Sequence, residues 1–140
     1  SDIEGQIMPI VPVKALVAAA KAVIETISPA DALARAEAGE ALLVDIRDVR
    51  ELDREGRIPG AFHAPRGMLE FWIDPDSPYH KPALATEQTL VLFCAGAWRS
   101  ALSARTAQEM GLEKVSHITD GFSGWKAAGG PVGERPARKG

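Results

Sequence analysis

The chain has 140 residues, of which 46% are hydrophobic and 25% are charged, and its formal net charge is −3. This length favours one domain with its own core, and the composition is that of an ordinary globular protein. The chain lacks the basic excess that nucleic-acid-binding proteins carry, so we expect no nucleic-acid partner. Its single cysteine cannot form an intrachain disulfide, which fits a reducing compartment, and we expect a cytoplasmic location.

The first apolar stretch, from Val11 to Ile27, is rich in alanine and predicts a helix over residues 12–26. The stretch is too short for a membrane span, and it is interrupted by three charged residues: Lys14, Lys21 and Glu25. A cleaved signal peptide is disfavoured because no basic region precedes the apolar residues. We therefore expect an accessory helix that packs on the domain and no membrane partner.

Short helices and strands alternate from residue 28 onward. Ser28 followed by Pro29 predicts a helix start, and this helix ends near Gly39. The apolar run 41–46, which contains Asp45 near its end, predicts a buried parallel strand. Further strands are expected over 61–64, 89–93 and 115–118, and further helices over 47–55, 68–72, 99–110 and 120–128. This alternation predicts an α/β layered domain.

The helix over 99–110 is expected to bury Leu102, Thr106 and Met110. We expect three segments: an N-terminal tail and accessory helix at 1–27, the main domain at 28–132, and a C-terminal tail at 133–140.

The segment 74–82 contains three prolines and opposes regular structure. A loop of this length in a compact domain is often functional, so one interpretation is a wall or lid over the site. The other is a surface excursion stiffened by proline.

The apolar strand 89–93 runs directly into the only cysteine, Cys94, and a helix begins near Arg99 and Ser100. Backbone N–H groups converge at such a junction, and the positive end of the helix dipole favours a thiolate or an anionic substrate. The pattern is typical of sulfur or phosphorus chemistry. Four residues separate the cysteine from the arginine: Ala95, Gly96, Ala97 and Trp98.

The stretch from Cys94 to Ser100 resembles the active-site loop of the rhodanese family. Two other stretches agree with this resemblance in order, 44–61 with the first family signature and 120–125 with the C-terminal one. Arg57 stands where the family usually has histidine, and Asp120 stands where a second glycine is common. The resemblance implies a rhodanese-like three-layer α/β domain, with a central, mostly parallel sheet flanked by helices on both faces.

The resemblance also implies a sulfurtransferase with Cys94 as its catalytic nucleophile. The thiolate would take the sulfane sulfur of a donor such as thiosulfate, hold it as a persulfide, and pass it to a thiophilic acceptor. The acceptor is cyanide in vitro and a cellular thiol in vivo, on a small molecule or on a protein. Cell-cycle phosphatases with a related fold have one more residue between cysteine and arginine. The four-residue spacing therefore favours sulfur over phosphate or arsenate.

The backbone N–H groups of residues 95–100 are expected to stabilise the thiolate and the persulfide. Arg99 either braces the loop or attracts an anionic donor, and Trp98 either forms an apolar wall or packs in the core. Asp45 and Arg47 are supporting residues, either as a structural ion pair or in catalysis.

Three histidines, His63, His80 and His117, lack metal-ligand spacing, so we expect no metal and no cofactor. His117 lies in an apolar strand and is expected to be packed or hydrogen-bonded. A persulfide carrier that serves a partner protein without turnover is the alternative to an enzyme. The loop has no charge between Cys94 and Arg99, so the identity of the donor stays open.

Overall fold

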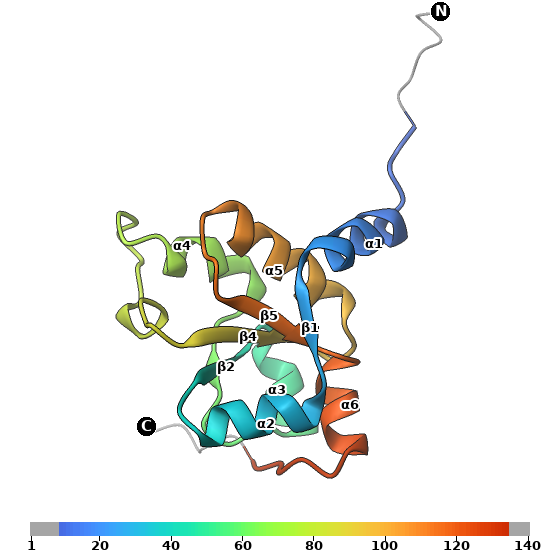
Figure 1. Ribbon diagram of the computed structural model, residues 1–140, viewed down its shortest axis with the longest axis vertical. Helices are drawn as coiled ribbons and strands as arrows, with labels where there is room; N and C mark the ends of the chain where they lie inside the picture. The colour runs from blue at the N-terminus through green and yellow to red at the C-terminus, as the bar shows by residue number, and fades with distance from the viewer. Residues whose placement is uncertain (1–8, 135–140) are drawn as a thin grey trace, which may run out of the picture.

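The computed structural model describes residues 9–134, and five strands within them form one sheet (Figure 1). The strands are β1 (Glu25–Ile27), β2 (Ala41–Asp45), β3 (Phe62–His63), β4 (Thr89–Phe93) and β5 (Val115–Ile118). Their order across the sheet is β1-β5-β4-β2-β3, and each neighbouring pair is parallel. The expected α/β architecture with a central parallel sheet is confirmed.

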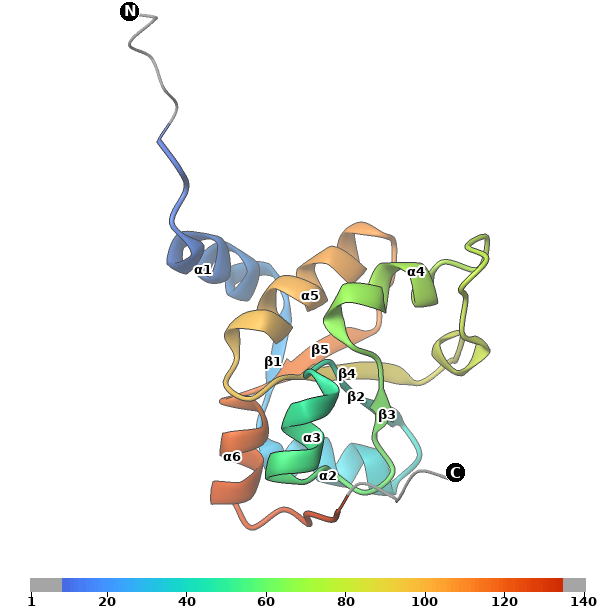
Figure 2. The same ribbon diagram turned by 180° about the vertical axis from the view of Figure 1, so that it is seen from behind.

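Helices cover both faces of this sheet. They are α1 (Val13–Val23), α2 (Pro29–Glu37), α3 (Val49–Glu55), α4 (Leu69–Ile73), α5 (Trp98–Glu109) and α6 (Gly121–Ala127), with single 3₁₀ turns at Arg66–Met68 and Pro82–Leu84. Helices α1, α4 and α5 lie over one face, and α2 and α6 lie over the other with α3 beside them (Figures 1 and 2). Within residues 9–134, no helix has the length and apolar character needed to cross a membrane.

Small side chains form the buried stripe of α5, which lies against the centre of the sheet. The stripe consists of Ser100, Ala101, Ser103, Ala104 and Ala107. The prediction that Leu102, Thr106 and Met110 are the buried residues is wrong, because Met110 is exposed and the other two are only partly covered. Small residues let the helix axis approach the sheet closely, and residues 94–97 join the end of β4 directly to α5.

The accessory helix is shorter than predicted. Helix α1 ends at Val23, and β1 pairs with β5, with Thr26 opposite His117. The β-branched residues Ile24, Thr26 and Ile27 favour a strand, so the helix prediction is wrong over 24–26. Helix α1 contributes Val17, Ala20 and the adjoining Ile24 to a core that it shares with α5. The division of the chain at residues 27/28 and 132/133 stays a prediction, and most of the C-terminal tail lies outside the described residues.

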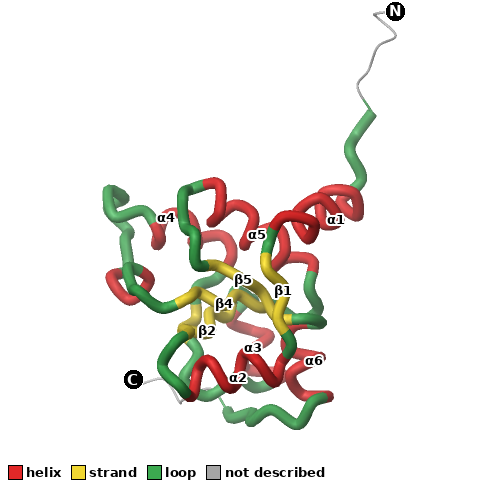
Figure 3. The backbone as a smooth tube through the Cα atoms, in the orientation of Figure 1, coloured by secondary structure: helices red, strands yellow, loops and turns green. Residues whose placement is uncertain are grey.

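The proline-rich segment between α4 and β4 forms a loop at one side of the molecule (Figure 3). The backbone N–H of Lys81 donates to the Trp72 carbonyl at 2.9 Å, and the Lys81 ammonium lies 4.9 Å from the centre of the Trp72 ring. The loop is therefore packed on α4. It leads into the amino end of β4, whereas Cys94 follows the carboxyl end, so its position fits the interpretation as a surface excursion.

Candidate active site

Cys94 follows β4 at the carboxyl edge of the sheet, and only 1% of its surface is exposed. Strand β4 lies between β2 and β5, and Phe93 is opposite Asp45 in the register with β2. Pairing on both sides fixes the end of β4, which in turn fixes the position of the thiol. Helix α5 begins at Trp98, so the cysteine loop consists of residues 94–97.

The amino end of α5 has no side-chain cap and no acidic residue in its first turn. Helices α2 and α3 differ: Ser28 caps α2, Asp48 caps α3, and both helices have an acidic residue in the first turn. The first N–H groups of a helix have no partner within the helix and carry a partial positive charge. At α5 neither a capping side chain nor an acidic residue compensates this charge, so the loop beside Cys94 favours an anion.

Helix α6 holds the opposite side of the cysteine loop. The N–H of Phe122 donates to the Cys94 carbonyl at 2.8 Å, and the N–H of Ser123 donates to the Ala95 carbonyl at 3.0 Å. In a trans peptide the N–H of one residue points opposite to the carbonyl of the residue before it. The N–H groups of Ala95 and Gly96 therefore point away from α6 and are available to a ligand of the loop.

Gly121 makes this close approach feasible. Its φ is +56°, and a Cβ atom there would overlap the backbone carbonyls of Cys94 and Gly96. Asp120 precedes it with φ +55°, a left-handed conformation that aspartate tolerates better than most residues. Glycine is common at this position in the family, and Asp120 adopts the left-handed backbone conformation that glycine favours.

Arg99 is tied to α3 by a bidentate ion pair with Glu51. Its Nη1 and Nη2 donate to Glu51 Oε2 and Oε1 at 2.8 and 3.0 Å. The hydrogen bond from Arg99 lowers the pKa of Glu51, and the same bond raises the pKa of Arg99. Of the two roles expected for Arg99, the geometry supports bracing of the loop. No role for Glu51 was predicted from the sequence, although Asp48 followed by Glu51 three residues later is a capping-box pattern, which the structure shows.

Asp45 and Arg47 form a buried ion pair, each with 1% of its surface exposed. Arg47 Nε and Nη2 donate to the two carboxylate oxygens at 3.0 and 2.8 Å, and Nη2 also donates to the Gly56 carbonyl at 2.9 Å. The guanidinium lies 4.1 Å from the centre of the Phe122 ring. The pair thus joins β2, the end of α3 and the start of α6, which supports the structural interpretation of both residues.

Ser100 connects Cys94 to a buried histidine. The Cys94 thiol donates to Ser100 Oγ at 3.7 Å, and Ser100 Oγ lies 3.0 Å from His117 Nδ1. Burial lowers the pKa of His117 to about 4, and the positive charge of Lys21 contributes in the same direction. His117 is therefore a neutral, hydrogen-bonded imidazole at neutral pH. Sequence reasoning missed its link to Ser100, since nothing in the pattern of β5 indicates what lies opposite it on α5.

The other two histidines and Trp98 have simpler surroundings. His63 Nε2 lies 2.7 Å from the Arg47 carbonyl, and His80 Nδ1 lies 2.9 Å from the Trp72 carbonyl. Trp98 is 48% exposed, which argues against the core-packing interpretation. In the part of the chain that the structure describes, no group of three or more His, Cys, Asp or Glu side chains could hold a metal ion.

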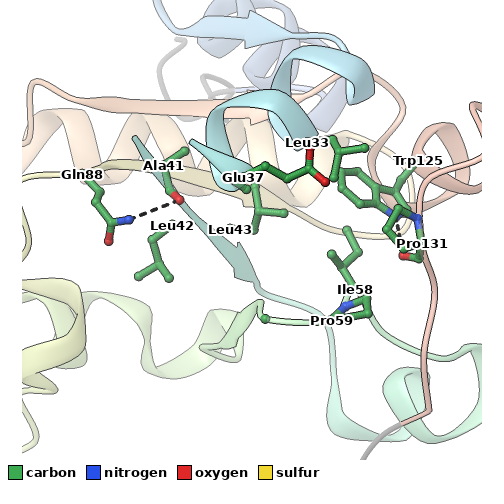
Figure 4. A pocket seen from close by; sticks show the side chains of 12 residues that line it. Leu33, Glu37, Ala41, Leu42, Leu43, Ile58, Pro59, Gln88, Trp125 and Pro131 are labelled. Carbon is green, nitrogen blue, oxygen red and sulfur yellow. Dashed lines mark hydrogen bonds between the residues drawn. The ribbon is translucent and has the colours of Figure 1, made fainter. Parts of the chain in front are cut away.

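A separate pocket lies near the amino ends of the strands (Figure 4). Residues of α2 and β2, the turn at 58–60, Trp125 and Pro131 line it, and Trp125 Nε1 donates to the Pro131 carbonyl at 2.8 Å. Ala41, which begins β2, lies in this lining, whereas Cys94 follows the carboxyl end of β4. Because the two strands are parallel, the pocket and the thiol lie at opposite ends of the sheet.

The sequence model of the rhodanese-like domain matches residues 28–128. The chain therefore belongs to the rhodanese-like family, as its three motifs predicted.

Three similar proteins illustrate the range of this family. A Rhodopseudomonas palustris protein of unknown function, described as a possible tyrosine phosphatase, is 50% identical to this chain. Its structure superposes with a TM-score of 0.83, and the match covers 90% of this chain and 99% of that protein's chain. The homodimeric polysulfide-sulfur transferase of Wolinella succinogenes is 32% identical, with a TM-score of 0.66 and 87% of both chains covered. The HTH-type transcriptional regulator Rv0324 of Mycobacterium tuberculosis is 34% identical over 79% of this chain and 45% of its own. The chain spans less than half the length of the curated relatives it matches.

Proposed function

We propose that this chain is a sulfurtransferase that carries sulfane sulfur as a persulfide on Cys94. The observation that carries the proposal is the position of the thiol. It lies at the uncapped amino end of α5, with Arg99 held beside it at the four-residue spacing. This arrangement favours an anionic sulfur and supplies the covalent nucleophile that sulfur transfer requires.

The first half of the reaction charges the cysteine. The Cys94 thiolate attacks the outer sulfur of thiosulfate, a sulfur–sulfur bond forms, and the sulfur–sulfur bond of the donor breaks with its electron pair on sulfite. The persulfide that results is itself an anion. The loop N–H groups and the Arg99 guanidinium stabilise its negative charge.

The second half discharges the persulfide. A nucleophilic acceptor, cyanide or a thiolate, attacks the outer sulfur, and the electron pair of the breaking bond returns to Cys94 as the thiolate. No electrons are gained or lost overall, so the cycle needs no cofactor. A reducing, cytoplasmic setting would supply thiol acceptors, and a protein thiol is one of them.

Polysulfide is a second candidate donor beside thiosulfate. The Wolinella succinogenes relative is named a polysulfide-sulfur transferase, and the likeness covers 87% of each chain. The apolar loop of this chain, with alanines at 95 and 97 and an exposed Trp98, suits a donor with little charge along its length. Steady-state rates with thiosulfate, polysulfide and mercaptopyruvate would rank the donors.

Phosphatase action is the alternative that the Rhodopseudomonas palustris relative raises. Four residues between Cys94 and Arg99 make a tighter loop than the five of the related phosphatases, and this loop fits a single sulfur better than a tetrahedral phosphate. We expect no turnover of a chromogenic phosphate ester.

The test is thiocyanate production from a sulfane donor and cyanide. The wild-type protein should produce it, and Cys94→Ser should not. Cys94→Ser retaining the wild-type rate would overturn the proposal. A stable persulfide without thiocyanate would favour the alternative of a carrier that serves a partner protein.

A further inference from the structure

A line of hydrogen bonds runs from Cys94 across the sheet to its edge. The Cys94 thiol lies 3.7 Å from Ser100 Oγ, Ser100 Oγ lies 3.0 Å from His117 Nδ1, and His117 Nε2 lies 2.9 Å from Thr26 Oγ1. The four residues come from the end of β4, the first turn of α5, the middle of β5 and the centre of β1. Packing of separate elements, rather than local sequence, brings them together.

The line connects the interior with solvent. Cys94, Ser100 and His117 are buried, with at most 1% of their surface exposed. Thr26 is exposed, because β1 is an edge strand of the sheet. A buried thiol that must ionise needs a route for its proton, and the outer end of this line is an exposed residue.

A neutral imidazole permits two orientations of the whole line. With a Cys94 thiol, the S–H donates to Ser100, and Ser100 donates to His117 Nδ1 at 3.0 Å in preference to the Ala97 carbonyl at 3.4 Å. His117 Nε2–H then donates to Thr26. With a Cys94 thiolate, every bond reverses: Thr26 donates to Nε2, Nδ1–H donates to Ser100, and Ser100 donates to the sulfur. His117 changes tautomer between the two states and remains uncharged in both.

We propose that Cys94, Ser100, His117 and Thr26 form a proton path along which His117 positions the Ser100 hydroxyl toward the Cys94 thiolate. In one passage Ser100 takes the thiol proton and gives its own to Nδ1, Nε2 gives its proton to Thr26, and Thr26 gives its proton to water. The proposal rests on the proposed role of Cys94 as a thiolate nucleophile.

Charge near the path supports a neutral histidine. Lys21, on α1, is the charged residue whose field reaches His117, and its positive charge opposes formation of an imidazolium. Burial acts in the same direction. The imidazole therefore passes a proton on instead of holding it.

The ring nitrogens of His117 provide the direct test. ¹⁵N spectra of histidine-labelled protein distinguish the two tautomers, and the ultraviolet absorbance of the thiolate follows Cys94. We expect His117 to change from the Nε2–H to the Nδ1–H tautomer with the same midpoint as thiolate formation. The same change should be lost in Cys94→Ala. A tautomer that stays fixed while the thiolate forms, or that changes equally in Cys94→Ala, would overturn the proposal.

Variants of His117 separate positioning from simple packing. His117→Leu removes the donor to Ser100, and the loss of a hydrogen bond that supports a charged group should raise the midpoint of thiolate formation by about one to two pH units. His117→Asn keeps an N–H at the Nδ1 position and should shift the midpoint by less than half as much. Equal midpoints in all three proteins would contradict positioning by His117.

The exposed end of the path allows a mild test. Thr26→Val removes the hydroxyl but keeps a β-branched residue in β1, whereas Thr26→Ser keeps the hydroxyl. After a rapid rise in pH, thiolate formation should be slower in Thr26→Val than in Thr26→Ser, and equal rates would exclude Thr26 from the path. These readouts follow the thiol and the imidazole without sulfur transfer. A failure of the proposed function with a normal tautomer change is therefore distinguishable from a failure of the path.

Discussion

Glu51 and Arg99 join the first turn of α3 to the first turn of α5. Glu51 Oε2 accepts hydrogen bonds from Arg99 Nη1 at 2.8 Å and from the Asp48 backbone N–H at 3.0 Å. One carboxylate therefore completes the cap of α3 and braces the cysteine loop, so the motif around residues 44–61 reaches the site through Glu51.

Glu51→Gln separates these two roles. Glutamine can still close the capping box, but it removes the charge opposite Arg99. We expect the free energy of unfolding to fall by less than about 1 kcal/mol, since the pair is only partly buried. The kcat/KM for sulfur transfer should fall about threefold to tenfold, because the loop loses its brace. The control is Glu55→Gln at the exposed end of α3, which should keep wild-type kinetics. Unchanged kinetics in Glu51→Gln would show that the ion pair between Glu51 and Arg99 does not support the cysteine loop.

Gly121→Ala should destabilise the protein strongly. The new Cβ would overlap the Cys94 and Gly96 carbonyls, in addition to the strain of a left-handed backbone. Gly129→Ala is the matched control, because Gly129 has φ +82° and open space around its Cβ position. Urea unfolding should show a loss of about 1 kcal/mol for Gly129→Ala and at least twice that for Gly121→Ala. Equal losses would mean that close packing of α6 against the cysteine loop does not contribute to stability.

Asp45→Asn should reduce stability without acting on the chemistry. It leaves the buried Arg47 guanidinium without its counter-ion, and breaking a buried pair in this way costs about 3–5 kcal/mol. Chemical denaturation measures this loss, and Asp48→Asn, which keeps a capping side chain on the surface, should unfold near the wild-type midpoint. At temperatures where Asp45→Asn remains folded, its rate of sulfur transfer should match wild type, and a specific loss of rate there would assign Asp45 to catalysis.

Acid should destabilise the protein through His117. Its folded-state pKa of about 4 lies below the ordinary value of 6.5, so between these values the unfolded chain binds a proton that the folded protein excludes. The free energy of unfolding is not reduced by His117 above pH 6.5, and it decreases as the pH falls from 6.5 toward 4. The free energy of unfolding should drop by about 2 kcal/mol between pH 7 and pH 5 from this source. Urea titrations of wild type and His117→Asn test this, and an equal drop in both proteins would contradict it.

Four of the five strands and the three motifs could be predicted from the sequence, but the side-chain contacts between elements could not. Strand β4 and the junction at Cys94 were predictable because an apolar run ends at a polar turn followed by a helix. Strand β1 was missed because Ile24 and Ile27 continue the helical spacing of the apolar residues before them, and only pairing with β5 makes residues 25–27 a strand. The buried stripe of small side chains on α5 was missed because small residues give only a weak periodic pattern of hydrophobicity.

The site shows the same division. Cys94 and Arg99 were predicted from the four-residue spacing between them at the junction of β4 and α5. Glu51 and His117 contact the first turn of α5 from α3 and β5, so their contacts depend on how distant elements pack.

Intact mass after exposure to a sulfane donor tests the central claim most directly. Cys94 is the only cysteine, so the wild-type protein should gain the mass of one sulfur atom, and cyanide should then remove that atom with release of one equivalent of thiocyanate. Cys94→Ser should gain nothing. A wild-type protein whose mass stays unchanged, or an equal gain in Cys94→Ser, would contradict a persulfide on Cys94.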